Sequence, residues 1–207
     1  RENPLGVETT KNNVLDNVIN KGVYYVPKKA IITSSPSMDI TKASNFERLL
    51  FDMFDKDPEK VGKFMKELDR DKIVNLYQYG LTKEKFREEG FYSGKSSHDD
   101  RLNAIRRVYR ESGIIIDTHT ADGVTVGFNK HVVGDKVPMV IFETALAVKF
   151  EPTIYEALGF VPEREERFKG IEEKVKHISL PVVKPGDVES VKGHIASKAK
   201  EYFKRDF

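Results

Sequence analysis

Three short apolar runs, each ending abruptly in small hydroxylic or acidic residues, constrain the fold of this 207-residue chain more than any other feature. They are residues 31–32, followed by Thr33 to Asp39, residues 114–116, followed by Asp117 to Thr120, and residues 137–142, followed by Glu143 and Thr144. Short β-branched runs are typical of buried strands. Longer stretches with helical spacing lie between them. Single buried strands that alternate with helices predict an α/β fold with a mostly parallel sheet flanked by helices.

Helices are predicted where apolar residues recur three or four positions apart next to capping residues. They are expected at residues 12–21 with Gly22 as C-cap, at 46–54, at 58–68, at 97–109 with Ser97 and Asp100 as a variant capping box, at 154–158 and at 188–203. Residues 73–95 carry scattered glycines and predict short elements and turns. The number of strands is low for the length, so we expect the sheet to be completed by residues outside this chain.

The pattern divides the chain into two parts, residues 1–160 with the α/β pattern and residues 161–207 as a charged, proline-containing linker with a C-terminal helix. The 35 basic and 33 acidic residues nearly cancel, which gives no electrostatic footprint for nucleic acid. No apolar stretch approaches the roughly 20 residues that cross a bilayer. The absence of cysteine excludes disulfides and thiolate chemistry. These features predict a cytoplasmic protein without nucleic-acid or membrane partners.

The polar residues after the three runs form the candidate site, because ligands in open α/β sheets bind at the carboxyl ends of strands. The alternative is that these Ser, Thr and Asp residues only cap the helices that follow. No complete catalytic set or metal-binding motif is visible, and Gly123 with Gly127 is too sparse for a phosphate loop. His119, beside Asp117, is either functional or a structural histidine at a helix start. The remaining histidines lie in polar segments and are interpreted as incidental: His98, His131, His177 and His194.

Several segments resemble motifs of one enzyme family, in the same order and with similar spacing. They are Ser35-Pro36-Ser37-Met38-Asp39-Ile40 with Ser44-Asn45-Phe46-Glu47-Arg48-Leu49-Leu50-Phe51, then Asp117-Thr118-His119-Thr120-Ala121-Asp122-Gly123-Val124, then Thr144-Ala145 with Lys149-Phe150 and Ala157-Leu158-Gly159, and more loosely Thr9 to Tyr24. The family is that of the bacterial and fungal threonine synthases. The resemblance covers nearly the whole chain and identifies it with a C-terminal portion of these enzymes.

This resemblance implies the fold-type II architecture of pyridoxal-phosphate enzymes, with residues 1–160 as the C-terminal part of the large cofactor-binding domain. It implies conversion of O-phosphohomoserine and water to threonine and phosphate, a lyase reaction of threonine biosynthesis in which pyridoxal 5'-phosphate is the electron sink. The family holds the cofactor on a lysine in a Ser-Phe-Lys-Asp-like motif and its phosphate in a Gly-Asn-Phe-Gly loop. Neither motif is present here, and Lys149 is not the counterpart of that lysine. Because the chain also starts at Arg1 without an initiator Met, we expect a truncated product that is inactive alone.

The family counterpart of Thr144 faces the pyridine nitrogen of the cofactor, and a hydroxyl there leaves that nitrogen largely neutral. The resemblance therefore implies that Thr144 is a cofactor-binding residue, with helix capping as the alternative. It also implies a set of substrate-facing candidates: Ser37, Asp39, Asn45, His119 and Arg48. Glu47 and Arg48 are adjacent on a helix, and structural hydrogen bonds are the alternative for this pair. No catalytic residue is expected within the chain.

The chain departs from the family pattern at three positions. Leu146 and Ala147 replace a His-Pro pair, and Thr118 replaces a proline before His119. Loss of that histidine removes a titratable group, which leaves open a threonine-synthase-like phospho-lyase that releases phosphate without making threonine. A third interpretation is an α/β binding module without catalysis. An incomplete sheet would expose unpaired N–H and C=O groups, so we expect self-association or a partner along that edge.

Overall fold

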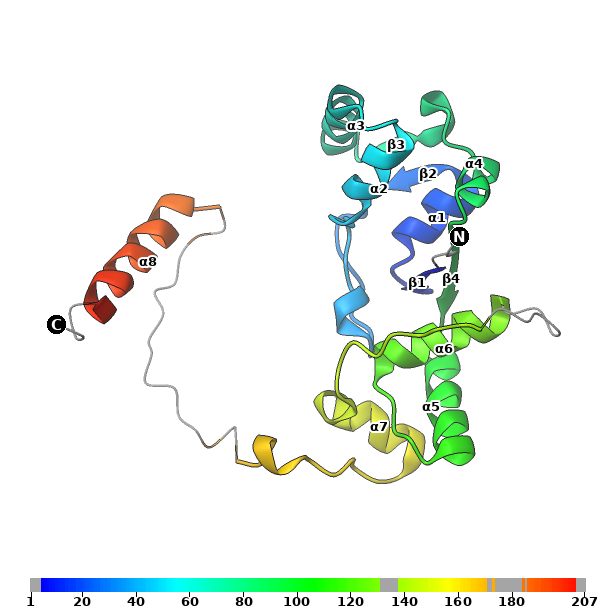
Figure 1. The fold of residues 1–207 in the computed structure, drawn as a ribbon, viewed down its shortest axis with the longest axis vertical. Coiled ribbons are helices and arrows are strands. Elements are labelled where there is room, and N and C mark those ends of the chain that lie inside the picture. Colours follow the sequence, from blue (N-terminus) through cyan, green and yellow to red (C-terminus); the bar gives the residue numbers. More distant parts are fainter. Residues whose placement is uncertain (1–4, 131–137, 171–172, 174–183, 185, 204–207) are drawn as a thin grey trace. The chain divides into compact units, whose positions relative to one another are not determined.

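A computed structural model describes residues 5–130, 138–170, 173, 184 and 186–203 of the chain (Figure 1). The chain divides into two compact units, Arg1–Glu163 and Arg164–Phe207, and each is described by itself. The strands are β1 (Leu5–Thr9), β2 (Val23–Tyr25), β3 (Ile73–Asn75) and β4 (Tyr92–Ser96). The α-helices are α1 (Val14–Lys21), α2 (Phe46–Met53), α3 (Pro58–Asp71), α4 (Lys83–Glu88), α5 (His98–Ser112), α6 (Thr118–Lys130), α7 (Glu151–Leu158) and α8 (Val188–Phe203). Short 3₁₀ helices are η1 (Pro36–Met38), η2 (Leu76–Tyr79), η3 (Ala147–Phe150) and η4 (Glu166–Phe168).

The first unit contains a parallel pair of strands, β1 and β4, which pair from Leu5 opposite Tyr92 to Thr9 opposite Ser96. β1 leads through a short turn into α1, and β4 leads directly towards α5. Both α1 and α6 pack against the two strands. A second pair, β2 and β3, is antiparallel. The α/β class predicted from the sequence is confirmed, because helices pack against a parallel pair of strands (Figure 1).

An aromatic core lies among α1 to α4 and the β2–β3 pair. Phe46, Phe54 and Phe64 are buried there, and rings in this core meet at centroid distances between 5.1 and 6.4 Å. The Tyr24 hydroxyl accepts the N–H of Ala43 at 2.9 Å. Since Ala43 lies just before α2, this core also fixes the end of the segment that leads from the candidate site into α2.

A second core lies where α5 packs against α6 and α7. Leu102 and Ile105 of α5, Val124 of α6 and Ile154 of α7 are buried in it. Figure 1 shows these three helices gathered next to the end of β4. Their packing sets the positions from which polar side chains of α5 and α6 reach that strand end.

Close packing around α6 depends on three glycines. A Cβ added to Gly94 of β4 would stand 2.6 Å from Cγ1 of Val126. A Cβ on Gly123 would stand 2.9 Å from Cγ2 of Ile141, and one on Gly127 would stand 3.2 Å from Cδ1 of the same residue. Gly123 and Gly127, rejected as a phosphate loop from the sequence, are thus positions where residues 138–142 lie directly on α6.

The second unit contains η4 and α8 among the described residues. α8 buries none of its residues, and Val191, Ile195 and Tyr202 are exposed. The helix predicted at residues 188–203 is confirmed, while the division at residue 160 stays a prediction. Within the described part of the chain, no helix has both the length and the apolar content of a membrane span.

The other helices predicted from local patterns are confirmed as well. α1 ends at Gly22, whose φ of 66° is the left-handed conformation that glycine adopts most easily. α5 begins with the capping box of Ser97 and Asp100, with both reciprocal hydrogen bonds present. These features depend on residues three or four positions apart, so the sequence alone identifies them.

The three apolar runs chosen as strands are not strands. Residues 31–33, 114–116 and 138–142 have no strand assignment, and Val137 lies outside the described residues. The side chains of Ile32 and Phe142 are 92% and 82% exposed. An apolar run becomes a strand only where another segment pairs with it, and none of the described residues does so here. Two of the strands that do form, β1 and β4, are richer in Gly, Ser, Thr and charged residues, and for that reason the sequence did not identify them.

Candidate functional site

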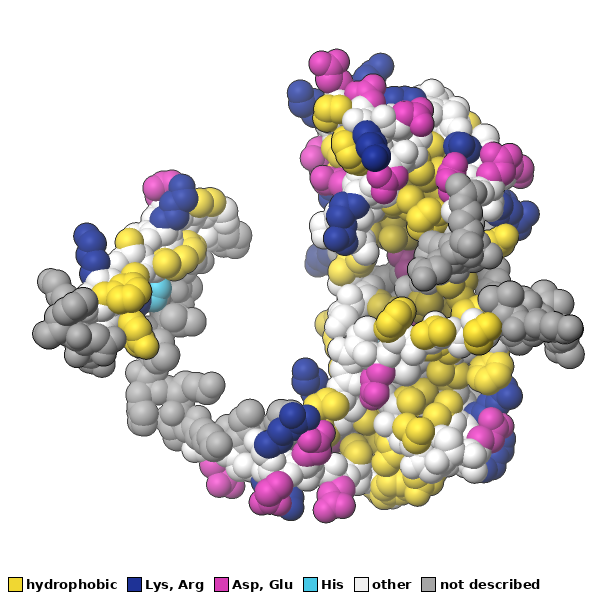
Figure 2. Space-filling model, in the orientation of Figure 1, with side chains coloured by type: hydrophobic (Ala, Val, Ile, Leu, Met, Phe, Trp, Pro, Cys, Tyr) yellow, Lys and Arg dark blue, Asp and Glu magenta, His cyan; other side chains and the backbone are white. Residues whose placement is uncertain are grey.

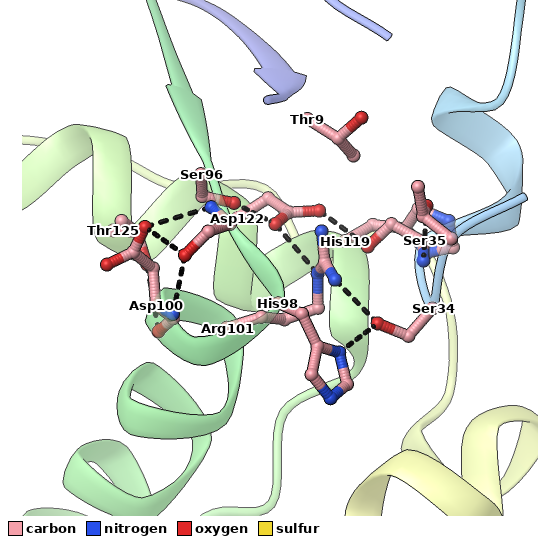
Figure 3. Close-up of polar contacts among 12 residues, drawn as sticks. Thr9, Ser34, Ser35, Ser96, His98, Asp100, Arg101, His119, Asp122 and Thr125 are labelled. Atoms are coloured by element: carbon pink, nitrogen blue, oxygen red, sulfur yellow. Dashed lines mark hydrogen bonds and ion pairs between the residues drawn. The ribbon is translucent and has the colours of Figure 1, made fainter. Parts of the chain in front are cut away.

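The polar segments after two of the apolar runs come together at the carboxyl ends of β1 and β4 (Figure 3). Residues 33–39, which we call the 33–39 loop, contain η1, and residues 117–122 comprise the cap residue of α6 and its first turn. Hydrogen bonds join these two segments to each other, and they also join Asp122 to Ser96 at the end of β4. The two segments thus meet at strand ends, but at the ends of β1 and β4 rather than of the apolar runs, and a ligand site there stays a prediction.

Asp122 is the centre of this cluster. Its Oδ2 accepts the Ser35 hydroxyl at 2.5 Å, and its Oδ1 accepts the Ser96 hydroxyl and, at 2.9 Å, Nε of Arg101. Nη1 of Arg101 donates to Oγ of Ser34 at 2.5 Å. Burial raises the pKa of Asp122 above its ordinary value, and the positive charge of Arg101 and the hydrogen bonds lower it only in part. One buried ion pair thus ties the 33–39 loop to α5, α6 and β4.

Arg101, which is 1% exposed, was not identified from the sequence. A signal was present, because Arg101 precedes Ile105 by four residues and Val108 by seven, which places it on the helix face that carries those apolar residues. His98 was interpreted as incidental, yet its Nδ1 lies 2.8 Å from Oγ of Ser34 and its Nε2 lies 3.0 Å from Oε1 of Glu156. His98 therefore links the 33–39 loop to α7. His131 and His177 lie outside the described residues.

His119 is held by Asp117 and by the 33–39 loop. Asp117 caps α6, since its Oδ1 accepts the N–H of His119 at 2.8 Å, and the same oxygen lies 3.0 Å from Nδ1 of that histidine. Nε2 of His119 accepts the N–H of Ser37 at 3.0 Å. Burial alone would raise the pKa of Asp117, but the hydrogen bonds from His119 and Thr120 outweigh burial and hold that pKa below its ordinary value. Asp117 is therefore a carboxylate at neutral pH, and it both caps the helix and orients the ring.

Asp39 closes the 33–39 loop. Its Oδ1 accepts from the Thr33 hydroxyl at 2.7 Å and from Nδ2 of Asn12 at 2.8 Å, and its Oδ2 accepts the N–H of Thr33 at 2.7 Å. The Asn12 amide also pairs with both backbone groups of Ile31, at 2.7 and 2.9 Å. Both oxygens of the Asp39 carboxylate thus accept hydrogen bonds from the protein itself, whereas the Ser37 side chain is exposed on the loop surface.

The other candidates from the sequence lie outside this cluster. Thr144, Asn45 and Arg48 are exposed, and no hydrogen bond within the described part of the chain joins any of them to the cluster. Among the described residues, no group of three His, Asp or Glu side chains is arranged to hold a metal ion. The structure therefore brings Ser37, Asp39 and His119 together. The other three candidates lie on the surface outside the cluster.

Another buried carboxylate, that of Glu8 in β1, lies at the start of α1. Its two oxygens accept the N–H groups of Leu15 at 3.0 Å and Asp16 at 2.7 Å. Glu8 thus caps α1 in place of Asn13, which makes no side-chain capping bond. Burial raises the pKa of Glu8 to about 7, and the two N–H groups reduce that shift only in part.

Comparison with known families and proteins gives one consistent result. Residues 120–195 match the family model described as "Threonine synthase, C-terminal". The chain is 43% identical over 170 residues to threonine synthase from Methylobacillus glycogenes, an alignment that covers 81% of this chain and 35% of that protein. It is 40% identical over 195 residues to threonine synthase from Corynebacterium glutamicum, covering 92% of this chain and 39% of that protein.

Comparison with solved structures also finds threonine synthases. A crystal structure of PLP-bound threonine synthase from Brucella melitensis superimposes with a TM-score of 0.72 and 28% identity, covering 82% of this chain and 35% of that one. The chain thus spans somewhat more than a third of the length of these relatives.

Proposed function

The chain corresponds to the C-terminal portion of threonine synthases, and on that basis we propose that it forms one side of the active site of such an enzyme. The reaction is the conversion of O-phosphohomoserine and water to threonine and phosphate by a pyridoxal-phosphate-dependent lyase. The observation that carries this proposal is the meeting of the 33–39 loop with residues 117–122, because both segments resemble family motifs. Two motifs more than 80 residues apart in the sequence support one surface.

We propose that Thr144 lies at one edge of the pyridoxal phosphate ring. Thr144 is exposed after residues 138–142, and its hydroxyl has no hydrogen-bonding partner within the described part of the chain. A free hydroxyl of this kind suits the pyridine nitrogen, as the resemblance implies, and leaves that nitrogen largely neutral. When bound, the cofactor supplies an electron sink for carbanions at the substrate. The chain has no counterpart of the family lysine motif or phosphate loop, so we propose that it is inactive by itself.

The substrate side is proposed to use exposed donors near the 33–39 loop. Ser37 presents an exposed hydroxyl, and Asn45 and Arg48 are exposed at the start of α2. A guanidinium is well suited to a phosphate ester because it donates charge-assisted hydrogen bonds, which makes Arg48 the phosphate candidate in this chain. Asp39 and His119 belong to the same proposed substrate-facing surface, and the hydrogen bonds of their side chains hold the 33–39 loop in its conformation.

Product analysis tests the proposed reaction. The intact protein that contains these residues, supplied with pyridoxal phosphate and O-phosphohomoserine, should form threonine and phosphate in equal amounts. Arg48→Lys keeps the charge and loses the paired donors, and Asp71→Asn on the distant end of α3 is the matched control. We expect a higher KM for the first variant and an unchanged KM for the second. Absence of both products from the wild-type protein would contradict the proposal.

A phospho-lyase is the second candidate, and the departures at Leu146 and Ala147 favour it. Both residues are partly buried, and Ala147 packs against the second core. Because neither leucine nor alanine has a titratable side chain, this position offers no acid or base. The product analysis separates the two reactions, since a phospho-lyase yields 2-oxobutyrate and phosphate without threonine. Equal release of threonine and phosphate would exclude it.

Self-association is proposed for the isolated chain. Figure 2 shows hydrophobic side chains gathered over α6 and residues 138–142, where Val140 and Phe142 are exposed. Ile32 is also exposed, and these runs have the composition of buried strands. We propose that the chain self-associates through the edge of its incomplete sheet, and that these exposed runs add apolar contact area; a monomer over the whole concentration range in sedimentation velocity would refute this. We also propose that the protein is located in the cytoplasm.

A further inference from the structure

The hydrogen bonds of His119 fix which ring nitrogen carries the proton (Figure 3). The N–H of Ser37 points at Nε2 over 3.0 Å, and a backbone N–H can only donate. Nε2 must therefore keep its lone pair. The proton of the neutral ring lies on Nδ1, from which it is donated to the Asp117 carboxylate 3.0 Å away.

The side chains and backbone around the His119 ring leave neither of its nitrogens available to a ligand. His119 is 7% exposed, and its ring packs edge-on against Phe150 of η3 at a centroid distance of 4.9 Å. Asp117 is the charged group that contacts the ring within the described residues, while the loop contributes Ser37 and η3 contributes Phe150. Both nitrogens are occupied and Phe150 packs against the ring, so a substrate has no free nitrogen to use.

The loop that His119 holds is also tied at its other end. Ser34 and Ser35 bind Arg101 and Asp122, so the 33–39 loop is attached to α5 and α6 on both sides of Pro36. Most N–H groups of the loop already have partners within it, including those of Met38 and Asp39. The loop can therefore meet a ligand through exposed side chains such as Ser37, provided that its backbone stays in place.

We propose that His119 is a positioning residue: a neutral imidazole, protonated on Nδ1, that holds the backbone of Ser37 and thereby sets the substrate-facing surface of the 33–39 loop. This inference rests on the proposed function for the identity of the substrate, but the protonation state of the ring does not. The competing role is a general acid or base, which requires a ring nitrogen that exchanges a proton with the substrate.

The protonation state is measured by two-bond ¹H–¹⁵N correlation NMR of the intact protein, labelled with ¹⁵N on histidine, at neutral pH, with His119→Gln used to assign the signals. We expect the Nδ1–H form for His119. The Nε2–H form, or a doubly protonated ring, would overturn the proposal. Since no substrate is added, this result stands even if the proposed reaction is wrong.

Kinetics of the intact enzyme test the role itself. The amide oxygen of His119→Gln can accept the N–H of Ser37, whereas His119→Ala cannot. His119→Ala should raise KM roughly tenfold, the factor expected for one lost hydrogen bond, while His119→Gln restores KM to within about threefold of wild type. Both variants should keep kcat within about threefold and the wild-type pH profile. A loss in kcat of about a hundredfold or more for His119→Gln, with one limb of the profile missing, would show acid–base catalysis instead.

Discussion

Replacing Asp122 by alanine tests the buried ion pair that organises the site. Arg101 is 1% exposed and Asp122 is fully buried, so the substitution leaves a guanidinium in the protein interior without its carboxylate. Breaking a buried pair in this way costs about 3–5 kcal/mol. The hydroxyls of Ser35 and Ser96 each lose an acceptor as well, at about 1 kcal/mol each. We therefore expect Asp122→Ala to lower the free energy of unfolding by about 5–7 kcal/mol.

The double variant Arg101→Met with Asp122→Ala separates the stranded charge from the lost hydrogen bonds. Removing the guanidinium abolishes the largest cost, so the double variant should be more stable than Asp122→Ala alone by at least about 2 kcal/mol. Urea unfolding of the 207-residue chain, followed by circular dichroism, measures both differences. Asp71→Ala, which breaks an exposed pair with Arg70, is the control and should leave the unfolding midpoint unchanged.

Two results would refute this reasoning. The first is a loss below about 1 kcal/mol for Asp122→Ala, which would mean that water or another group compensates the charge of Arg101. The second is a double variant less stable than Asp122→Ala, which would mean that Arg101 stabilises the fold by packing rather than through the ion pair. An Asp122→Ala chain that is unfolded without urea, next to a folded double variant, agrees with the prediction.

Three further predictions concern other parts of the chain. The pKa of Glu8 is raised from 4.5 to about 7, so folding favours its protonated form, and stability should fall by up to about 3 kcal/mol as pH rises from 4.5 to 7; urea unfolding across this range should show a flatter profile for Glu8→Gln. Gly94→Ala brings a Cβ to 2.6 Å from Cγ1 of Val126 and should cost about 1–3 kcal/mol, while in the Val126→Ala background the same change should cost less than about 1 kcal/mol; equal costs in both backgrounds would contradict the packing argument. In the intact enzyme, Thr144→Val should lower kcat roughly tenfold while Thr144→Ser retains it, and equal rates would remove Thr144 from the cofactor contacts.

The fold was predictable from the sequence where local patterns determine it. The cap at Gly22 and the capping box at Ser97 depend on neighbours within one helical turn, and both were identified. β1 and β4 depend on distant partners instead. Glu8 can be buried in β1 because α1 supplies two N–H groups, and Gly94 is required in β4 because Val126 of α6 packs against it. No pattern within either strand contains that information.

The candidate site shows the same division. The segments after residues 32 and 116 were chosen because polar segments after apolar runs are typical of strand ends, and they do meet, although the runs before them are not strands. Arg101 was missed, since a single arginine in a charged helix resembles a surface residue until its partner Asp122 is known. The alternatives for His119 could not be separated from sequence either, because they differ only in which atom faces Nε2.

The location of the cofactor lysine tests most directly whether this chain is one side of a pyridoxal-phosphate site. The intact protein is loaded with pyridoxal phosphate, reduced with borohydride and digested, and the modified peptide is identified by mass spectrometry. We predict one modified lysine, outside residues 1–207, and no stoichiometric modification when the 207-residue chain is treated alone. A stoichiometric adduct on Lys149, or on any other lysine of this chain, would contradict the account.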